Sequence, residues 1–236
     1  MDASEEVESQ ADAFERIEAA VAAGDTDLGR LGFWRLVAGI KSDPATSRRW
    51  AEVAGRIDRR AFEARVRPRF PVWLGNAVLV LGTLAGCLAV GLALETTSEV
   101  TAGLALLAAA GVWSVSWHDL GHWLIGRAVG IRFTAYFIGG PFPPRPGLKI
   151  DYATYLRVGP AARAWMHASG AILTKVASFA ALAFWPATDA PGWAAWGLVA
   201  LGALQIGTDA VFSVRSSDWK KVRRELRVAR LQASNR

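Results

Sequence analysis

The sequence predicts an all-α membrane protein with four transmembrane helices, a small helical cytoplasmic N-terminal segment and a short interfacial loop that bears a strand. Hydrophobic residues make up 52% of the 236-residue chain, and most of them gather in four long stretches with almost no charged side chains. Because a helix needs about 20 apolar residues to cross the hydrocarbon core of a bilayer, each stretch is long enough to span it. We expect the spans at 72–94, 100–127, 164–186 and 191–214.

The rest of the chain is too short to cover four such helices with protein, which disfavours a large soluble domain. Residues 71–215 are therefore expected to form a transmembrane core, preceded by segment 1–70 and followed by a basic tail at 216–236. Apolar residues at helical spacing predict helices in the N-terminal segment. One of these helices should have Asp43 as its N-cap and Pro44 in its first turn.

The charges that flank the spans predict their orientation. Basic residues precede the first span, occupy the loop between the second and third spans, and follow the fourth, whereas the other two loops carry acids and no base. Under the positive-inside rule, both termini and the central loop lie in the cytoplasm. Membrane topology accounts for the net charge of +6, so nucleic acid is not an expected partner. The single cysteine, Cys87, excludes an intrachain disulfide.

The central loop, about 130–163, is expected to be irregular apart from one strand. Its first part, "IRFTAYFIGG", is rich in strand-forming residues, whereas the following "PFPPRPG" favours extended backbone and excludes regular structure. The edge of a strand at a membrane surface can pair with an extended peptide, so residues 131–140 could align a substrate. The alternative is a loop that simply lies on the interface, anchored by its tyrosines.

Two of the three histidines stand four residues apart in "SWHDLGHWLIGRAVG", inside the second predicted span. Residues four apart share one face of a helix, so His118 and His122 can bind one metal ion together. The spacing approaches HExxH, in which the acid activates a zinc-bound water, and Asp119 occupies the position of that acid. Ionisable groups inside a membrane are costly and usually functional. The alternative is a pair of structural histidines with hydrogen bonds between helices.

A catalytic zinc site needs a third protein ligand. Polar residues line one side of the fourth predicted span, and their depth in the membrane favours Asp209, while Asp218 lies just beyond that span and His167 is a further candidate on the third. Asp209 and Asp218 face opposite sides of a continuous helix, so both cannot serve unless the helix breaks between them. Lys175 is expected to neutralise a carboxylate, to hold a substrate carbonyl or to extend toward the cytoplasmic surface.

The succession of "HDLGH", "HASGAILTK" and "TDAVFSVRSSDW" resembles the site-2 protease family of intramembrane zinc metallopeptidases over roughly residues 100–225. The resemblance implies a core of three transmembrane helices, zinc as the cofactor, and a transmembrane or membrane-associated peptide as the substrate. It aligns Thr174 with an asparagine on the family's middle helix, so Thr174 is expected to bind substrate beside Lys175. It also aligns Asp218 with the family's aspartate ligand. Membrane depth, in contrast, favours Asp209 as the third ligand.

Two functions fit these residues. The first is an intramembrane zinc metallopeptidase, in which His118, His122 and one aspartate hold zinc and Asp119 takes a proton from the metal-activated water. The second is a catalytically inactive metal-binding protein that binds membrane partners, because aspartate replaces the glutamate of HExxH. Haem binding is a third alternative. Two histidines four apart on one helix cannot be opposite axial ligands of one haem, so His167 would have to join them.

Overall fold

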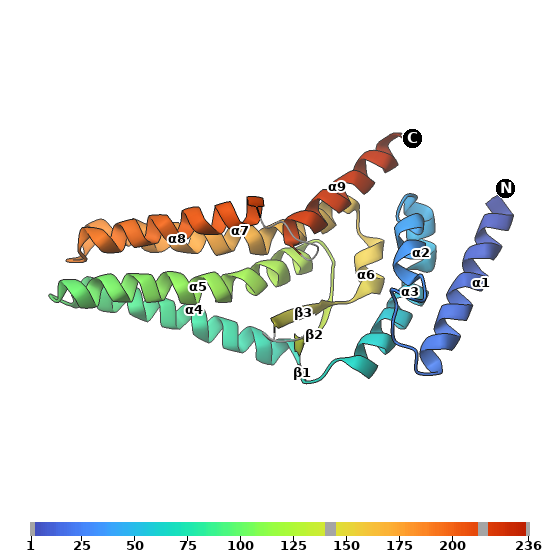
Figure 1. The fold of residues 1–236 in the computed structure, drawn as a ribbon, viewed down its shortest axis with the longest axis horizontal. Helices are drawn as coiled ribbons and strands as arrows, with labels where there is room; N and C mark the ends of the chain where they lie inside the picture. Colours follow the sequence, from blue (N-terminus) through green and yellow to red (C-terminus); the bar gives the residue numbers. More distant parts are fainter. Residues whose placement is uncertain (1–2, 140–144, 212–216, 235–236) are drawn as a thin grey trace. The chain divides into compact units, whose positions relative to one another are not determined.

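The structure is a computed structural model that describes residues 3–139, 145–211 and 217–234, and most of them are helical (Figure 1). The chain forms two compact units. The first, which we call the N-terminal unit, comprises Met1–Val72, Arg127–Arg163 and Glu225–Arg236; the second, the helix-bundle unit, comprises Trp73–Gly126 and Ala164–Arg224. Segments that composition assigns to the N-terminal region, the central loop and the tail therefore share one compact unit.

The N-terminal unit begins with three helices, α1 (Ala3–Ala22), α2 (Phe33–Ile40) and α3 (Pro44–Arg65). The predicted start of α3 is confirmed: the Asp43 carboxylate accepts a hydrogen bond from the backbone N–H of Thr46 at 2.6 Å, and Pro44 is the first helical residue. The core between these helices consists of apolar side chains that are almost fully buried. They include Phe14, Ile17, Val21, Phe33, Val37, Ile40, Ala51, Ala54 and Ile57.

An antiparallel sheet belongs to the same unit, with its strands in the order β1 (Arg69–Phe70), β2 (Phe133–Gly139) and β3 (Arg145–Ile150). β2 falls in the stretch for which the sequence predicts a strand. The expectation that "PFPPRPG" excludes regular structure is wrong for its last three residues, since β3 begins at Arg145, while 140–144 lie outside the described residues. Pro146 is tolerated because, within the part of the chain that the structure describes, β3 is an edge strand that pairs with β2 alone. The interfacial position of this sheet stays a prediction.

Among the described residues, three helices are long and apolar enough to cross a membrane, which is consistent with an integral membrane protein. They are α4 (Val72–Glu95), α5 (Glu99–Ala128) and the segment Pro160–Ala187, which consists of α7 (Pro160–Phe184) and one 3₁₀ turn. These helices match the first three predicted spans. Within the residues that the structure describes, α8 (Gly192–Val211) is not among the helices that meet this criterion. The fourth span, and with it the cytoplasmic location of both termini, stays a prediction.

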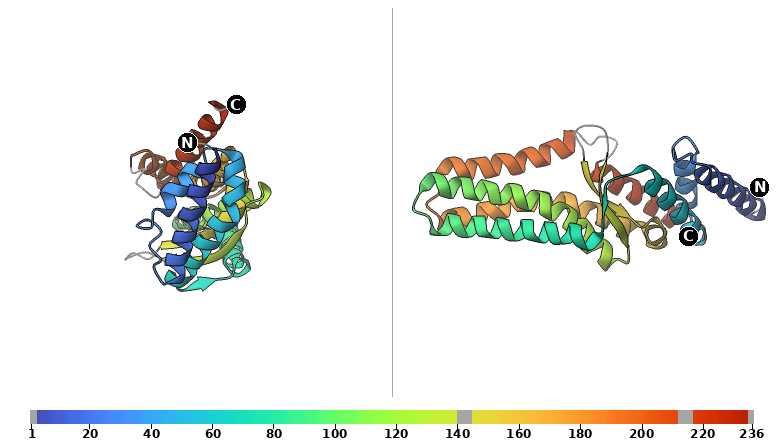
Figure 2. Two further views of the ribbon diagram at one scale, coloured as in Figure 1. Left: turned by 90° about the vertical axis from the view of Figure 1, so that its right-hand side faces the viewer. Right: turned by 90° about the horizontal axis from the view of Figure 1, so that it is seen from below.

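The helices α4, α5, α7 and α8 run alongside one another in the helix-bundle unit (Figures 1 and 2). Glycines bring them close together: a Cβ atom added to Gly86 of α4 would lie 2.2 Å from Trp113 Nε1 on α5. A Cβ atom added to Gly121 of α5 would lie 2.7 Å from Leu173 Cδ1 on α7. Helices associate in a membrane through such close contacts, because lipid tails are as apolar as the side chains and provide no hydrophobic driving force.

The N-terminal unit also contains a buried ion cluster, which joins α6 (Tyr152–Arg157) and α9 (Asp218–Ser234). Glu225 of α9 is fully buried, pairs with Lys41, and accepts hydrogen bonds from Tyr155 Oη at 2.9 Å and from Arg163 Nε at 2.7 Å. Burial alone would raise the pKa of the Glu225 carboxyl, but the charges of Lys41 and Arg163 outweigh it and hold that pKa below its usual range. The carboxylate is therefore ionised inside the unit.

Candidate metal centre

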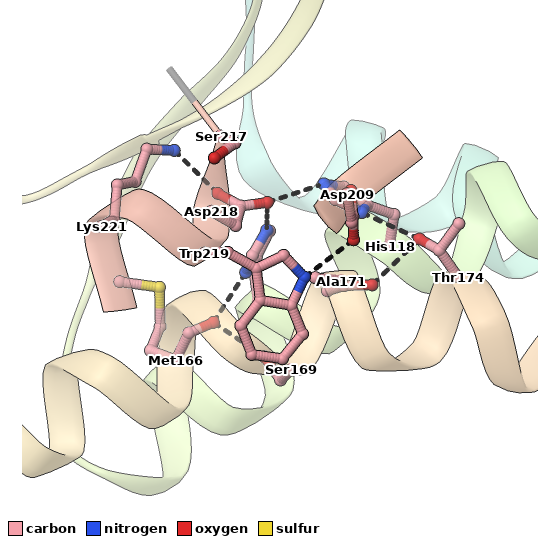
Figure 3. A network of polar contacts seen from close by, with 12 residues as sticks. His118, Met166, Ser169, Ala171, Thr174, Asp209, Ser217, Asp218, Trp219 and Lys221 are labelled. Atoms are coloured by element: carbon pink, nitrogen blue, oxygen red, sulfur yellow. Dashed lines mark hydrogen bonds and ion pairs between the residues drawn. The ribbon is translucent and has the colours of Figure 1, made fainter. Parts of the chain in front are cut away.

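Three potential metal ligands meet between α5 and the start of α9. His118 and His122 lie one helical turn apart on α5, as their spacing predicts, and Asp218 is the first residue of α9. Asp218 Oδ2 lies 3.4 Å from His118 Nε2 and 3.2 Å from His122 Nε2 (Figure 3). One donor atom from each residue lies within 4.8 Å of the others, so the group could hold a metal ion.

The second nitrogen of each imidazole ring is engaged by a neighbour on α7. His122 Nδ1 lies 2.7 Å from the carbonyl oxygen of Met166, and His118 Nδ1 lies 3.0 Å from the Thr174 hydroxyl (Figure 3). The Thr174 hydroxyl itself donates to the carbonyl oxygen of Gly170. Since a carbonyl only accepts, and the one hydroxyl proton is already used, both Nδ1 atoms are donors in this arrangement. Contacts of this kind fix the tautomer and orientation of metal-binding histidines.

The donor set fits a divalent cation for an electrostatic reason. With Nδ1 protonated, the Nε2 of a neutral imidazole carries a lone pair, and here both Nε2 atoms face the same carboxylate oxygen of Asp218. Electron pairs that face each other at such distances need a cation between them, which is either a proton or a metal ion. The convergence on one point suits a single ion, whereas a haem would need axial ligands on opposite faces.

Asp218 is ionised and ready to act as a ligand. Burial alone would raise the pKa of its carboxyl, but hydrogen bonds with His118 and His122 and the charge of Lys221 hold that pKa far below its usual range. Lys221 Nζ donates to the second carboxylate oxygen, Oδ1, at 2.8 Å (Figure 3). The Oδ2 atom of Asp218 therefore remains available on the side of the histidines. A carboxyl group binds metal in its deprotonated form.

Asp209, the alternative ligand, makes other contacts. Its Oδ2 accepts a hydrogen bond from Trp219 Nε1 at 2.7 Å and pairs with Lys175, whose ammonium also donates to the carbonyl oxygen of Ala171 at 2.7 Å (Figure 3). Lys175 thus neutralises a carboxylate, one of the roles expected for it. Of the two aspartates left open by the sequence, Asp218 is the one that the structure brings to the histidines.

The helix does break between the two aspartates, because Ser217, the residue directly before α9, is not helical. Membrane depth favours Asp209 only if residues 191–214 form one span and the chain beyond that span leaves the site. Instead, the Trp219–Asp209 hydrogen bond ties the first turn of α9 to α8. Asp209 therefore holds in place the turn that carries Asp218.

Two further predicted residues lie near this group. Electrostatic interactions relate Asp119, partly buried on α5, to His118, His122 and Asp218. His167 is buried on α7 with its ring centroid 6.4 Å from that of His122, and it is not one of the three grouped ligands. The catalytic role of Asp119 stays a prediction, while His167 packs beside His122.

One residue that sequence reasoning did not single out as part of the site is Gly170. A Cβ atom at this position would lie 2.4 Å from His122 Nε2 and 2.8 Å from the carbonyl oxygen of His118. Only glycine lets α7 approach the histidines so closely, because any side chain would occupy the space in front of the ring nitrogen. The small residues of "HASGAILT" are the signal for such an approach.

Comparisons with protein-family models, with curated proteins and with solved structures found no match to this chain. What the site can do therefore has to follow from the chemistry of its own residues.

Proposed function

We propose that the protein is an intramembrane zinc metallopeptidase that resembles the site-2 proteases and cleaves transmembrane or membrane-associated peptides. The observation that supports this most is the convergence of two imidazole Nε2 atoms on one carboxylate oxygen. Three protein ligands of these types are typical of catalytic zinc sites, which keep a fourth position open for water or substrate. The position of the histidines inside a span-length helix supports a reaction at the membrane.

In this proposal, His118, His122 and Asp218 hold the ion. When bound, zinc supplies a Lewis acid and lowers the pKa of a bound water toward neutrality. Asp119 accepts a proton from the attacking water and returns it to the amine nitrogen that leaves when the peptide bond breaks. The Thr174 hydroxyl orients the His118 ring, and the predicted contact of Thr174 with substrate stays a prediction.

Lys175 likewise takes a role within the site in this proposal, since it neutralises Asp209 and so supports the turn that carries Asp218. The Asp209 carboxylate accepts from Trp219 and from Lys175 together, which keeps the indole next to the ligand in one orientation. Lys175 and Asp209 thereby support the position of Asp218, and a contact of Lys175 with substrate stays a prediction.

A second function rests on one feature, the shorter carboxylate at position 119. Aspartate is one methylene shorter than the glutamate of HExxH, so its oxygen atoms reach less far toward the open coordination position. A protein that keeps the ion for structure and binds membrane partners would need no proton acceptor there. The two functions therefore differ in what Asp119 does.

The test is cleavage of a membrane-tethered peptide by zinc-loaded protein in proteoliposomes, with wild type, Asp119→Ala, Asp119→Glu and the exposed-residue control Asp189→Ala. Losing a positioned proton acceptor is expected to lower turnover by a factor of about 100 or more. Asp119→Ala should therefore lose that much activity at unchanged zinc content, while Asp189→Ala matches wild type.

Two outcomes would contradict the proposed peptidase mechanism. If Asp119→Ala cleaves as fast as wild type, the role given to Asp119 is wrong. If wild type holds zinc and never cleaves while Asp119→Glu does, the protein is the inactive metal-binding form.

A further inference from the structure

A pocket of about 280 Å³ in the N-terminal unit is lined by three arginines and, among the described residues, by no acidic or aromatic side chain. Arg48 comes from α3, Arg157 from the end of α6 and Arg163 from the first turn of α7. We call it the arginine pocket. Nothing in the proposed peptidase reaction uses it, so its charge needs an explanation of its own.

Arg163 is the most unusual of the three arginines. Its side chain is 1% exposed, and its Nε donates to Glu225, yet its Nη2 atom has no hydrogen-bond partner. Among the described residues, Nη2 of Arg163 is the one buried side-chain nitrogen or oxygen without a hydrogen-bond partner. A buried donor without an acceptor is costly, and such groups usually mark a water or an ion that completes them. Arg163 therefore indicates that an acceptor belongs in or beside the pocket.

The cationic lining of the pocket indicates that this acceptor is an anion. Arg163 is buried and shares the carboxylate of Glu225 with the buried Lys41, so that carboxylate does not serve Arg163 alone. Arg157 pairs with Glu52 at 2.6 Å, but both side chains are more than half exposed, and solvent screens that pair. A guanidinium nitrogen forms its stronger, charge-assisted hydrogen bond with a negatively charged acceptor.

A helix N-terminus contributes to the same pocket. Pro160, the first residue of the 25-residue helix α7, lines the pocket together with Gly159, whereas the N-terminus of α3 is already capped by the carboxylate of Asp43. The first N–H groups of a helix lack partners within the helix, and the N-terminal end of its dipole is positive. Both features favour a bound anion.

We propose that the arginine pocket binds a phosphate group. The planar fork of arginine matches phosphate oxygens and can donate two parallel hydrogen bonds, which favours phosphate over a spherical anion. The pocket falls below the roughly 300–1,000 Å³ of sites for drug-sized ligands, and no aromatic side chain lines it for a nucleobase to stack on. The ligand is therefore a small phosphate, which is either free or the headgroup of a lipid.

Isothermal titration calorimetry of the full-length protein in detergent tests this proposal. The probes are inorganic phosphate and dihexanoyl phosphatidic acid below its critical micelle concentration, both against a chloride background. Arg48→Gln and Arg157→Gln change exposed pocket residues, so the fold should survive, and Arg49→Gln changes the exposed neighbour of Arg48 that does not line the pocket.

Loss of one charge-assisted contact is expected to weaken phosphate binding about tenfold in Arg48→Gln and in Arg157→Gln, with Arg49→Gln unchanged. Phosphatidic acid that binds at least about tenfold more tightly than phosphate identifies a lipid headgroup as the ligand, and equal affinities identify free phosphate. The proposal is overturned if neither probe binds, or if Arg48→Gln and Arg157→Gln bind as wild type does.

Discussion

Replacing His122 with alanine is expected to abolish stoichiometric metal binding by the full-length protein. The change removes the ring whose Nε2 lies 3.2 Å from Asp218 Oδ2 and leaves two ligands, His118 and Asp218. Two protein ligands are fewer than the three that catalytic zinc sites use, and the hydrogen bond from the ring to Met166, which orients it, is lost as well. The measurement is the metal content of purified protein by inductively coupled plasma mass spectrometry.

The matched control is His167→Asn. His167 is the other histidine close to the site, buried on α7 with its ring centroid 6.4 Å from that of His122, but it does not belong to the ligand group. We expect this variant to retain the metal, with circular dichroism confirming that both variants remain helical. Full metal content in His122→Ala, or its loss in His167→Asn alone, would show that the ion is held elsewhere.

Replacing Gly170 with alanine is expected to weaken metal binding on the order of 10- to 100-fold, the range seen when groups that orient metal ligands are disturbed. The new Cβ atom would lie 2.4 Å from His122 Nε2, the nitrogen that faces Asp218, so either the ring or α7 must move. A single methyl group would thus act on the metal site without removing a ligand. A zinc competition titration against a chromophoric chelator measures the change.

Gly111→Ala is the control for this substitution. Gly111 lies on the same helix as the histidines, and a Cβ atom added there meets nothing within 4 Å. Alanine favours a helix over glycine, so this variant should bind zinc with wild-type affinity and unfold at the same temperature or higher. Equal zinc affinities for Gly170→Ala and wild type would mean that α7 does not approach the histidines as described.

The parts of the fold that follow from local composition could be predicted. Long apolar stretches identify α4, α5 and α7, because the length of a span is fixed by the bilayer and can be counted along the sequence. The start of β3 could not be predicted, since Pro146 argues against a strand and its acceptance depends on an edge position that only the sheet provides. The cluster around Glu225 joins it to Lys41, 184 residues away, and no spacing rule pairs the two.

At the metal site, too, features set by neighbouring residues could be predicted, and features that depend on distant residues could not. His118 and His122 could be paired because helix geometry is local and puts residues four apart on one face. The choice between Asp209 and Asp218 depends on where α8 ends, which composition does not fix, since Asp218 lies 96 residues from His122. The partner of His122 Nδ1 is a backbone carbonyl, that of Met166, and backbone groups carry no signal in the sequence.

X-ray absorption spectroscopy at the zinc edge, on purified full-length protein loaded with one equivalent of zinc, tests the metal centre most directly. The expected spectrum has two imidazole nitrogens at about 2.0–2.1 Å and carboxylate or water oxygens at about 2.0–2.2 Å, with no sulfur. Asp218→Asn should lower the zinc affinity, whereas Asp209→Asn should keep both imidazole ligands. Two results would contradict a site formed by His118, His122 and Asp218. One is a chain that binds no zinc, and the other is a zinc ion with the Cys87 sulfur as a ligand at about 2.3 Å.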